Sequence, residues 1–295
     1  MSLKAFKDYL LLEKKYSVHT VLAYSRDIEV FQKFLKSQFG IKDLKKTSYV
    51  NIRNWITVLV DEGLSNRSIN RKISSIKAYF KFLIKVQDLE LSPLSKHRSL
   101  KVRKKIQIPF SEDEIESVLS FDYEINFITI RNKLIIELLY STGIRRSELI
   151  NLKLHDIDLN QSQIKVLGKR NRERYVPLLK NVQDTIALYL SLRKKLNSIV
   201  NNEYFILTNK GKKIYSNLVY RVVNNYFENV SSKVKRSPHI LRHSFATHLL
   251  NNGADLNSVK ELLGHSSLAS TQIYTHNNIS ELKKIYNKSH PRAVD

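Results

Sequence analysis

A short stretch near the C-terminus gathers side chains that can bind and attack a phosphodiester. His239 and Arg242 are separated by three positions, so on a helix they project from one face, and Pro238 suits the first turn of that helix. His265 and Tyr274 follow in the same part of the chain. Because positioning and charge do most of the work in phosphoryl transfer, these groups suit an anionic phosphodiester attacked by a tyrosine.

Two further basic residues occur earlier in the chain. Arg145 follows Gly143 at a turn between predicted helices, where Glu148 can orient it, although an arginine at such a turn can equally be an ordinary surface residue. Lys169 lies at the tip of a predicted hairpin. From there its ammonium group can protonate a leaving 5′ oxygen or can contact phosphate backbone alone.

The phenol of Tyr274 needs activation before it can act as a nucleophile. A free phenol has a pKa of about 10, so neighbouring cations and a base must assist it. His239 is a candidate for that base. The polar segment around Tyr274 favours an exposed phenol, but the chain has 15 tyrosines and the residue type alone is weak evidence.

The sequence favours neither a metal site nor a cofactor site. His239, His243 and His248 share a predicted helix, but no His-Glu-x-x-His motif is present and Arg242 would repel a cation. The absence of cysteine excludes thiolate ligands and disulfide bonds. No Gly-rich nucleotide loop occurs, so we expect no metal and no cofactor.

The charge balance indicates a polyanionic partner. The chain of 295 residues carries 50 Lys and Arg against 27 Asp and Glu, a net charge of +23. Residues 1–104 hold 22 basic and 9 acidic side chains, and the remainder holds 28 and 18. This distribution is better explained by two basic regions that bind double-stranded DNA than by a membrane anchor. Without a signal peptide or an apolar spanning run, we expect a soluble, cytoplasmic protein and no membrane partner.

Hydrophobic periodicity predicts a mainly α fold of two domains. Residues 1–92 read as a four-helix module with helices over Leu3–Lys14, from Ser17 to near Gly40, over Val50–Val60, and from Ser65 onward. Pro93 stops this pattern, and residues 93–108 are polar and basic. This linker is either a solvated tether or a DNA-contacting segment.

Residues 109–295 read as a second, mixed α+β domain. A capping box over Ser111–Glu114 begins a helix, and an apolar helix follows over Ile128–Tyr140. Helices are expected at 180–196 and 216–230, with room for a strand at Tyr204–Leu207 between them. A small antiparallel β-meander is expected from three short strands, which are Ile157–Leu159, Gln163–Val166 and Arg174–Val176.

Five motifs occur through the second domain, namely Thr142–Leu149, Gly168-Lys169, His239–His248, Leu263–Ser266 and Thr271–His276. Together they resemble the motifs of the tyrosine recombinases of the phage-integrase family, and within it most resemble those of the XerC/XerD recombinases. The resemblance covers the whole chain, including the terminal His290-Pro291-Arg292-Ala293, and implies an N-terminal SAM-like core-binding domain and a catalytic domain.

The resemblance implies a role for each candidate residue. Arg145 and Arg242 would clamp the scissile phosphate with help from His265. Lys169 would be the general acid, His239 the proton acceptor, and Tyr274 the nucleophile that forms a 3′-phosphotyrosyl link. Glu148 matches the acidic position that supports the first arginine. Many relatives have glycine where this chain has Arg170, which leaves the geometry of the hairpin turn open.

The resemblance also implies a tetramer on two DNA sites that exchanges strands through a Holliday junction. The helix over Ile279–Tyr286 would then dock on a neighbouring subunit, although its apolar stripe can also pack on its own domain. The implied role is resolution of chromosome dimers at a dif-like site, as a homo- or hetero-tetramer with a second Xer recombinase and under an FtsK-type translocase. An integrase or transposase of a mobile element, a type IB topoisomerase and a non-catalytic architectural DNA-binding protein are the alternatives.

Overall fold

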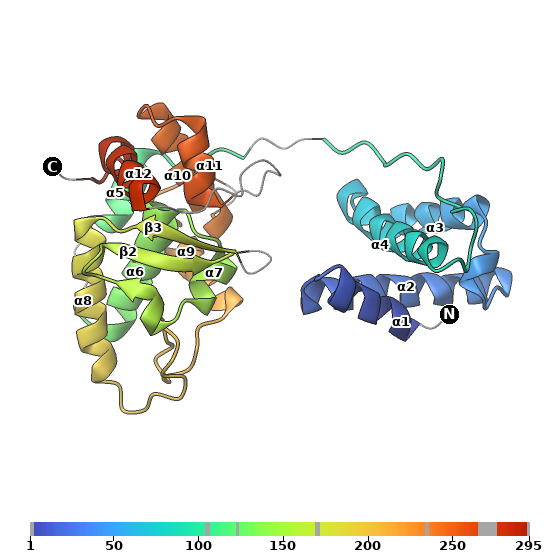
Figure 1. The fold of residues 1–295 in the computed structure, drawn as a ribbon, viewed down its shortest axis with the longest axis horizontal. Helices are drawn as coiled ribbons and strands as arrows, with labels where there is room; N and C mark the ends of the chain where they lie inside the picture. Colours follow the sequence, from blue (N-terminus) through green and yellow to red (C-terminus); the bar gives the residue numbers. More distant parts are fainter. Residues whose placement is uncertain are drawn as a thin grey trace. The chain divides into compact units, whose positions relative to one another are not determined.

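The computed structural model of the chain describes residues 3–103, 107–121, 124–168, 172–233, 236–264 and 276–293, with the backbone alone over 276–281. The chain divides into two compact units, residues 1–105 and 106–295 (Figure 1). Each unit closes around a hydrophobic core of its own. None of the helices in these ranges is long and apolar enough to cross a membrane.

The first unit is helical, as expected. Ser17, Ser48 and Ser65 each accept a backbone hydrogen bond and so begin a helix, which explains where the sequence starts its helices. Its elements are α1 (Leu3–Asp8), the π-helical turn η1 (Tyr9–Glu13), α2 (Val18–Phe39), the 3-10 turn η2 (Leu44–Lys46), α3 (Tyr49–Asp61) and α4 (Asn66–Lys85).

Aromatic packing and one buried carboxylate hold α2, α3 and α4 together. The rings of Phe31 on α2 and Trp55 on α3 lie 4.7 Å apart between centroids. Asp27 on α2 is buried, and its carboxylate accepts hydrogen bonds from Arg71 at 2.7 and 3.0 Å and from Ser75 at 2.7 Å. Partners on α4 therefore compensate the buried charge, which fixes how α2 and α4 pack.

Part of the stretch that we expected to act as a linker, residues 93–108, packs on the first unit. Leu94 is fully buried in its core. The side chain of Asn70 on α4 donates to the carbonyl of Leu100 and accepts from its N–H, both at 2.9 Å, while Asn66 donates to Lys101. Because their polar backbone groups are satisfied by α4, residues up to 101 belong structurally with the helices.

The second unit combines helices with a three-stranded sheet. The capping box over Ser111–Glu114 is present, as predicted. Its elements in chain order are α5 (Glu112–Leu119), α6 (Phe127–Thr142), α7 (Arg146–Asn151), the 3-10 turn η3 (Leu154–Asp156), β1 (Ile157–Asp158), β2 (Gln163–Leu167), β3 (Glu173–Pro177), α8 (Lys180–Lys194), α9 (Ser216–Tyr226), α10 (Pro238–Asn251), α11 (Leu256–Leu263) and α12 (His276–Ser289).

The sheet is the antiparallel meander that the sequence predicts, in the order β1-β2-β3. Ile164 pairs with Val176 and both are buried, whereas Lys165 and Tyr175, which pair beside them, are more exposed. The sheet therefore has one face on the core. Helix α6 is almost wholly buried beyond its first turn and packs against α8, α9 and α10.

Two sequence expectations for this unit were wrong. Tyr204–Leu207 does not form a strand: Tyr204 makes a single bridge to Lys153, and Leu207 makes another to Lys213. Its backbone groups find partners in two different loops, so no ladder can extend along it. Helix α9 ends at Tyr226, short of residue 230.

The apolar stripe of α12 packs on its own domain in the single chain, one of the two alternatives that the sequence leaves open. Leu282 and Tyr286 are buried, and Ile285 packs on the same core. The hydroxyl of Tyr286 donates to the carbonyl of Ser141 at the end of α6, 2.7 Å away. The side chain of Ile279 lies outside the described residues. In a single chain, packing against α10, α11 and β3 buries an apolar stripe that would otherwise be exposed to water.

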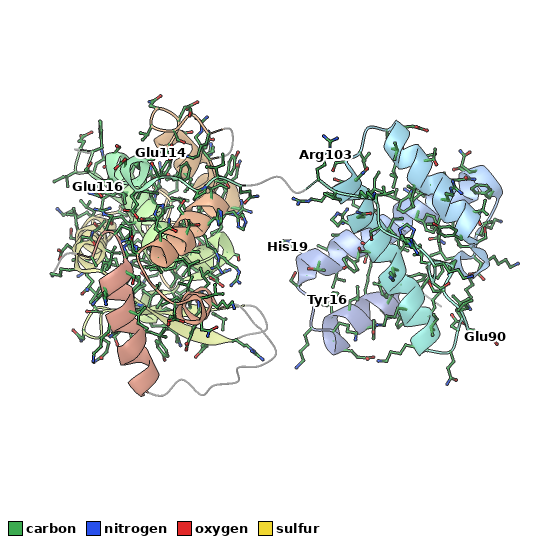
Figure 2. The ribbon with its side chains drawn as sticks, turned by 90° about the horizontal axis from the view of Figure 1, so that it is seen from above. Tyr16, His19, Glu90, Arg103, Glu114 and Glu116 are labelled. Atoms are coloured by element: carbon green, nitrogen blue, oxygen red, sulfur yellow. The ribbon has the colours of Figure 1, made fainter. Side chains whose placement is uncertain are left out.

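Helix α5 ties two distant segments of the second unit together. Glu114 and Glu116 project from it (Figure 2). Glu114 receives a hydrogen bond from Lys233, and Glu116 forms an ion pair of 3.4 Å with Arg292 in the C-terminal tail. The charged face of α5 thus anchors the segment before α10 and the tail after α12.

Candidate active site

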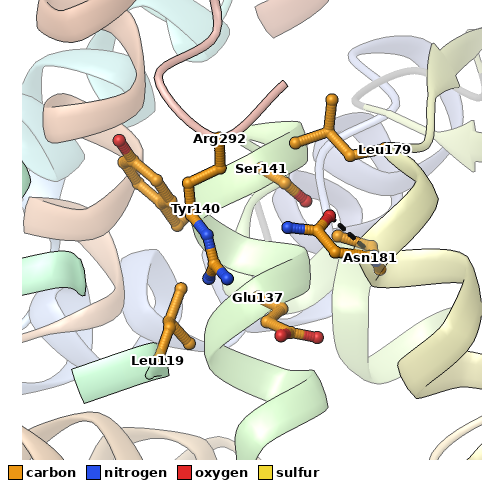
Figure 3. A pocket seen from close by; sticks show the side chains of 8 residues that line it. Leu119, Glu137, Tyr140, Ser141, Leu179, Asn181 and Arg292 are labelled. Carbon is orange, nitrogen blue, oxygen red and sulfur yellow. Dashed lines mark hydrogen bonds between the residues drawn. The ribbon is translucent and has the colours of Figure 1, made fainter. Parts of the chain in front are cut away.

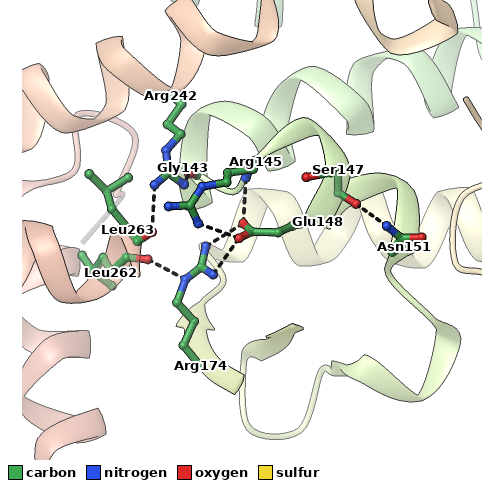
Figure 4. Close-up of polar contacts among 9 residues, drawn as sticks. All are labelled: Gly143, Arg145, Ser147, Glu148, Asn151, Arg174, Arg242, Leu262 and Leu263. Atoms are coloured by element: carbon green, nitrogen blue, oxygen red, sulfur yellow. Dashed lines mark hydrogen bonds and ion pairs between the residues drawn. The ribbon is translucent and has the colours of Figure 1, made fainter. Parts of the chain in front are cut away.

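Arg242 lies on the buried side of α10 and is fixed by two backbone carbonyls. Pro238 occupies the first turn of the helix, as predicted. The guanidinium of Arg242, 9% exposed, donates from Nη1 to the carbonyl of Gly143 and from Nη2 to the carbonyl of Leu263 at 2.8 Å (Figure 4). These bonds join α10 to the ends of α6 and α11.

Arg145 is the N-cap residue of α7, directly before the first residue of the helix. Gly143 ends α6 in the left-handed conformation, which turns the chain so that α7 can begin at Arg146. Glu148, expected from its spacing to orient Arg145, accepts from the Arg145 Nη1 at 2.7 Å and from its backbone N–H at 2.8 Å. The side chain of Arg145 is 38% exposed and that of Glu148 is 4% exposed, so a buried carboxylate fixes the position of a partly exposed arginine.

A third arginine, Arg174 on β3, completes the cluster, and sequence reasoning missed it. Its Nη1 and Nη2 donate to the two carboxylate oxygens of Glu148 at 3.2 and 2.8 Å, and its Nε donates to the carbonyl of Leu262 at 3.0 Å. A signal for it was present, because strand alternation places Arg174 on the same buried face as Val176. A charged residue on the core face of a strand needs a buried partner.

Two glycines allow these elements to approach closely. A Cβ on Gly143 would lie 2.3 Å from Cδ1 of Phe245, and one on Gly264 would lie 3.0 Å from Cδ of Arg174. Both glycines have positive φ, 59° and 64°. Glycine at these two positions therefore permits both the turns and the packing of α10, α11 and β3 around the arginines.

The cluster has an excess of positive charge that suits an anion. Burial opposes ionisation of Glu148, but hydrogen bonds and charge from Arg174, followed by Arg145, hold its pKa below the ordinary value. Burial, then the charge of Arg145, lowers the pKa of Arg242 to about 10, so this guanidinium stays protonated at neutral pH. Arg145 and Arg174 share the carboxylate of Glu148, and Arg242 adds a third guanidinium group to the described part of the cluster. This excess of guanidinium groups favours the non-bridging oxygens of a phosphodiester.

His239 lies in the first turn of α10, one turn from Arg242. Partial burial lowers the pKa of His239 below its ordinary value, and the charges of Arg242 and His243 lower it further. The imidazole is therefore neutral near neutral pH and has a lone pair to accept a proton.

The other two histidines of α10 point to separate partners. Nε2 of His243 lies 3.1 Å from the carbonyl of Gln107, and Nδ1 of His248 lies 2.9 Å from the hydroxyl of Tyr140. Among the described residues, no group of three His, Cys, Asp or Glu side chains is placed to hold a metal ion.

Lys169, His265 and Tyr274 lie outside the described residues. The described neighbours of the first two, Gly168 and Gly264, border the arginine cluster. The N–H of Gly168, next to Lys169, donates to the carbonyl of Arg172 at 2.7 Å and so closes the hairpin. Gly264, next to His265, ends α11 beside Arg174.

A small pocket elsewhere in the second unit has a different character (Figure 3). It is lined by Glu137, Ser141 and Arg292 together with apolar side chains. An oxygen of the buried Glu137 and the hydroxyl of Ser141 have no hydrogen-bond partner there. Burial raises the pKa of Glu137. The pocket contains none of the candidate residues.

Comparison with known proteins follows the division into two units. Residues 81–281 match the model of the phage integrase family, and residues 3–87 match that of the phage integrase N-terminal SAM-like domain. The chain is 39% identical to tyrosine recombinase XerC of Oceanobacillus iheyensis, over 98% of this chain and 95% of the relative. It is 36% identical to XerC of Chlorobaculum parvum, over 99% and 94%.

A solved structure shares the fold. The recombinase XerH bound to a palindromic difH substrate in a post-cleavage complex aligns with a TM-score of 0.71, at 22% identity, over 96% of this chain and 83% of that one.

Proposed function

The chain belongs to the phage integrase family and is a tyrosine-type, site-specific DNA recombinase of the Xer kind, and we propose that it resolves chromosome dimers at a dif-like site in the cytoplasm. Two curated relatives named XerC align over nearly their whole length, which supports this role over that of a mobile-element integrase. Double-stranded DNA is the substrate, in keeping with the net charge of +23.

The arginine cluster is the observation that carries the proposal. Arg145 and Arg242 bind the non-bridging oxygens of the scissile phosphate, and His265 adds a third donor. Glu148 keeps Arg145 in place, while the carbonyls of Gly143 and Leu263 keep Arg242 in place. Since the two arginines are fixed before DNA arrives, they stabilise the charge of the pentavalent transition state without reorganising.

Strand cleavage then needs a nucleophile, a base and an acid. The phenolic oxygen of Tyr274 attacks phosphorus while the bond from phosphorus to the 5′ oxygen breaks. The neutral imidazole of His239 takes the phenol's proton, and the ammonium of Lys169 gives one to the leaving 5′ oxygen. The 3′-phosphotyrosyl link conserves the energy of the phosphodiester, so rejoining to another 5′ hydroxyl requires no cofactor and no metal.

The two units have separate tasks in this proposal. Residues 1–92, with 93–101 packed on them, form the clamp on DNA, the rest of residues 93–108 connects it, and residues 109–295 hold the chemistry and the C-terminal docking segment. The working assembly is a tetramer on two DNA sites, formed by this chain alone or with a second Xer recombinase, and controlled by an FtsK-type translocase. Docking of α12 on a neighbour requires that Leu282 and Tyr286 first leave their own core.

Trapping of the covalent intermediate tests the proposal. Wild type and Tyr274→Phe are incubated in EDTA with nicked suicide duplexes that span candidate dif-like sequences, and denaturing gels show whether protein stays attached to DNA. A band from wild type alone is expected. A band from both proteins would place the nucleophile elsewhere.

The same assay separates the alternatives. Attachment to any supercoiled DNA without a paired site would indicate a type IB topoisomerase. Tight binding without a band, on every site and with every partner recombinase, would indicate an architectural protein. Recombination only of the ends of a mobile element would overturn the role in dimer resolution.

A further inference from the structure

We propose that Arg174 is a positioning residue of this active site, which acts by holding Glu148 so that Arg145 keeps N–H groups for the phosphate. The inference rests on the proposed strand-cleavage function. Arg174 and Glu148 are each 4% exposed at their side chains and face one another through two hydrogen bonds, 3.2 and 2.8 Å long. A pair so enclosed has one geometry, because neither group can turn toward water.

The division of the Glu148 carboxylate between the two arginines is the first step of the argument. Arg174 reaches both carboxylate oxygens, whereas the guanidinium of Arg145 reaches only Oε1, through Nη1 at 2.7 Å. Without Arg174, both oxygens would be available to Arg145, whose flat guanidinium favours a two-point pair with a carboxylate. Such a pair would neutralise Arg145 and occupy donors that the phosphate needs.

A second contact of Arg174 links this pair to the other arginine. Its Nε donates to the carbonyl of Leu262 at 3.0 Å, and the carbonyl of the next residue, Leu263, accepts from Arg242 at 2.8 Å. Adjacent carbonyls at the end of α11 therefore hold two arginines from different elements (Figure 4). Displacement of Arg174 would shift the support of Arg242 as well as that of Arg145.

The same side chain lies against the glycines that precede two proposed catalytic residues. A Cβ on Gly168 would lie 3.6 Å from Nη1 of Arg174, and one on Gly264 would lie 3.0 Å from its Cδ. Gly168 leads to Lys169 and Gly264 leads to His265. Arg174 thus contacts the hairpin, α7 and α11, which carry or directly precede three of the proposed catalytic residues, Lys169, Arg145 and His265.

Lysine cannot replace this arginine. One ammonium group cannot span two carboxylate oxygens and also reach a carbonyl from the other side, as a guanidinium does. Arg174→Lys and Arg174→Gln should therefore each slow single-turnover cleavage of a suicide duplex about 100-fold, the scale expected when reacting groups are misplaced by about 1 Å. The dissociation constant for the same duplex should barely change, because many other basic side chains contact the phosphates.

Arg193 offers a matched control in the same unit. It is 5% exposed and bonds only neutral groups in its described surroundings, the carbonyls of Asn202 at 2.9 Å and Tyr204 at 3.2 Å among them. Arg193→Gln should lower the free energy of unfolding, as loss of any buried arginine does, and leave the cleavage rate of the folded fraction unchanged.

A double-mutant cycle decides whether Arg174 acts through Glu148. If it does, Arg174→Gln, Glu148→Gln and the variant with both changes should slow cleavage by similar factors. The factor for the double variant should then lie well below the product of the two single-variant factors. Equal cleavage by wild type and Arg174→Gln, a multiplicative double loss, or the same loss in Arg193→Gln would each overturn the inference. Failure of wild type to cleave would overturn the proposed function instead.

Discussion

The guanidinium of Arg242 and the carbonyl of Leu263 lie 2.8 Å apart, joined by a hydrogen bond from Nη2, while Nη1 donates to Gly143. The two carbonyls belong to the ends of different helices, α6 and α11. A planar group that is bonded at two of its nitrogens cannot rotate, so the fold itself sets the direction in which Arg242 presents its charge.

We therefore expect Arg242→Lys to be nearly as damaging to catalysis as Arg242→Ala. Lysine keeps the charge but cannot satisfy both carbonyls and a phosphate together. Each variant should slow cleavage of a suicide duplex at least about 1000-fold, the scale of a lost transition-state arginine, and keep most of the DNA affinity. Rapid-quench cleavage and equilibrium binding measure the two quantities.

A surface arginine is the control for that experiment. Arg221 on α9 donates to the hydroxyl of Tyr215 at 3.0 Å in an exposed position. Arg221→Lys should cleave as wild type does. If Arg242→Lys retained more than a tenth of the wild-type rate, the two carbonyl contacts would not be what makes this residue effective.

Substitution of Gly143 tests the close packing beneath the site. In Gly143→Ala, the new Cβ would meet Phe245 at 2.3 Å and Leu263 at 2.9 Å, at a φ of +59°. Gly253 has a φ of +86° but nothing within 4 Å of a Cβ. Gly253→Ala should thus lower the free energy of unfolding by about 1 kcal/mol from backbone strain alone, and Gly143→Ala by about 3 kcal/mol because overpacking adds to the strain.

Urea unfolding of the second unit measures the difference. The only tryptophan, Trp55, lies in the first unit, so far-UV circular dichroism combined with tryptophan fluorescence separates the two transitions. Equal losses for the two variants would show that α10 can move away from Gly143.

Local signals explain why much of the fold could be predicted from the sequence. Ser17, Ser65 and Ser111 begin helices because a short side chain caps free N–H groups, and this depends only on neighbouring residues. The contact of Glu148 with Arg145 was predictable for the same reason, since three positions of helix separate them.

The remaining features depend on contacts between distant parts of the chain. Arg174 and Glu148 meet only because β3 packs beside α7, and no local spacing shows that. The segment Tyr204–Leu207 has strand-forming residues, but its backbone pairs with two separate loops instead of a strand. Whether α12 packs on its own domain or on another subunit depends on which apolar surface is available, and in the single chain that surface is its own core.

The pH dependence of cleavage should report His239. Because burial and nearby positive charges lower its pKa, the imidazole becomes a competent base at a pH below its ordinary 6.5. The cleavage rate should rise with pH through a midpoint below 6.5 and then level off, and His239→Gln should lose this acidic limb. An NMR titration that follows the chemical shift of an imidazole ring carbon of His239 against pH should give the same midpoint in wild type. A midpoint above 6.5 in both measurements would contradict the assignment.

Stability should depend on pH through His290, in the C-terminal tail. Its ring is 4% exposed and lies 5.2 Å from the rings of both Tyr140 and Tyr286. Burial, followed by the charge of Arg292, lowers the pKa of His290 to about 3. Between pH 6.5 and about 3, His290 is therefore protonated in the unfolded chain and neutral in the folded chain. As a result, the free energy of unfolding falls as the pH falls through this window.

His290 alone should remove about 2 kcal/mol from the free energy of unfolding of the second unit between pH 7 and pH 5. In His290→Phe, an aromatic ring of similar size keeps the contacts with Tyr140 and Tyr286 but cannot bind a proton, so the loss over the same interval should shrink by that amount. His155→Gln, at an exposed position, should behave as wild type does. The comparison requires urea unfolding of the three proteins at both pH values. An equal loss in wild type and His290→Phe would mean that the tail leaves its own core before His290 is protonated.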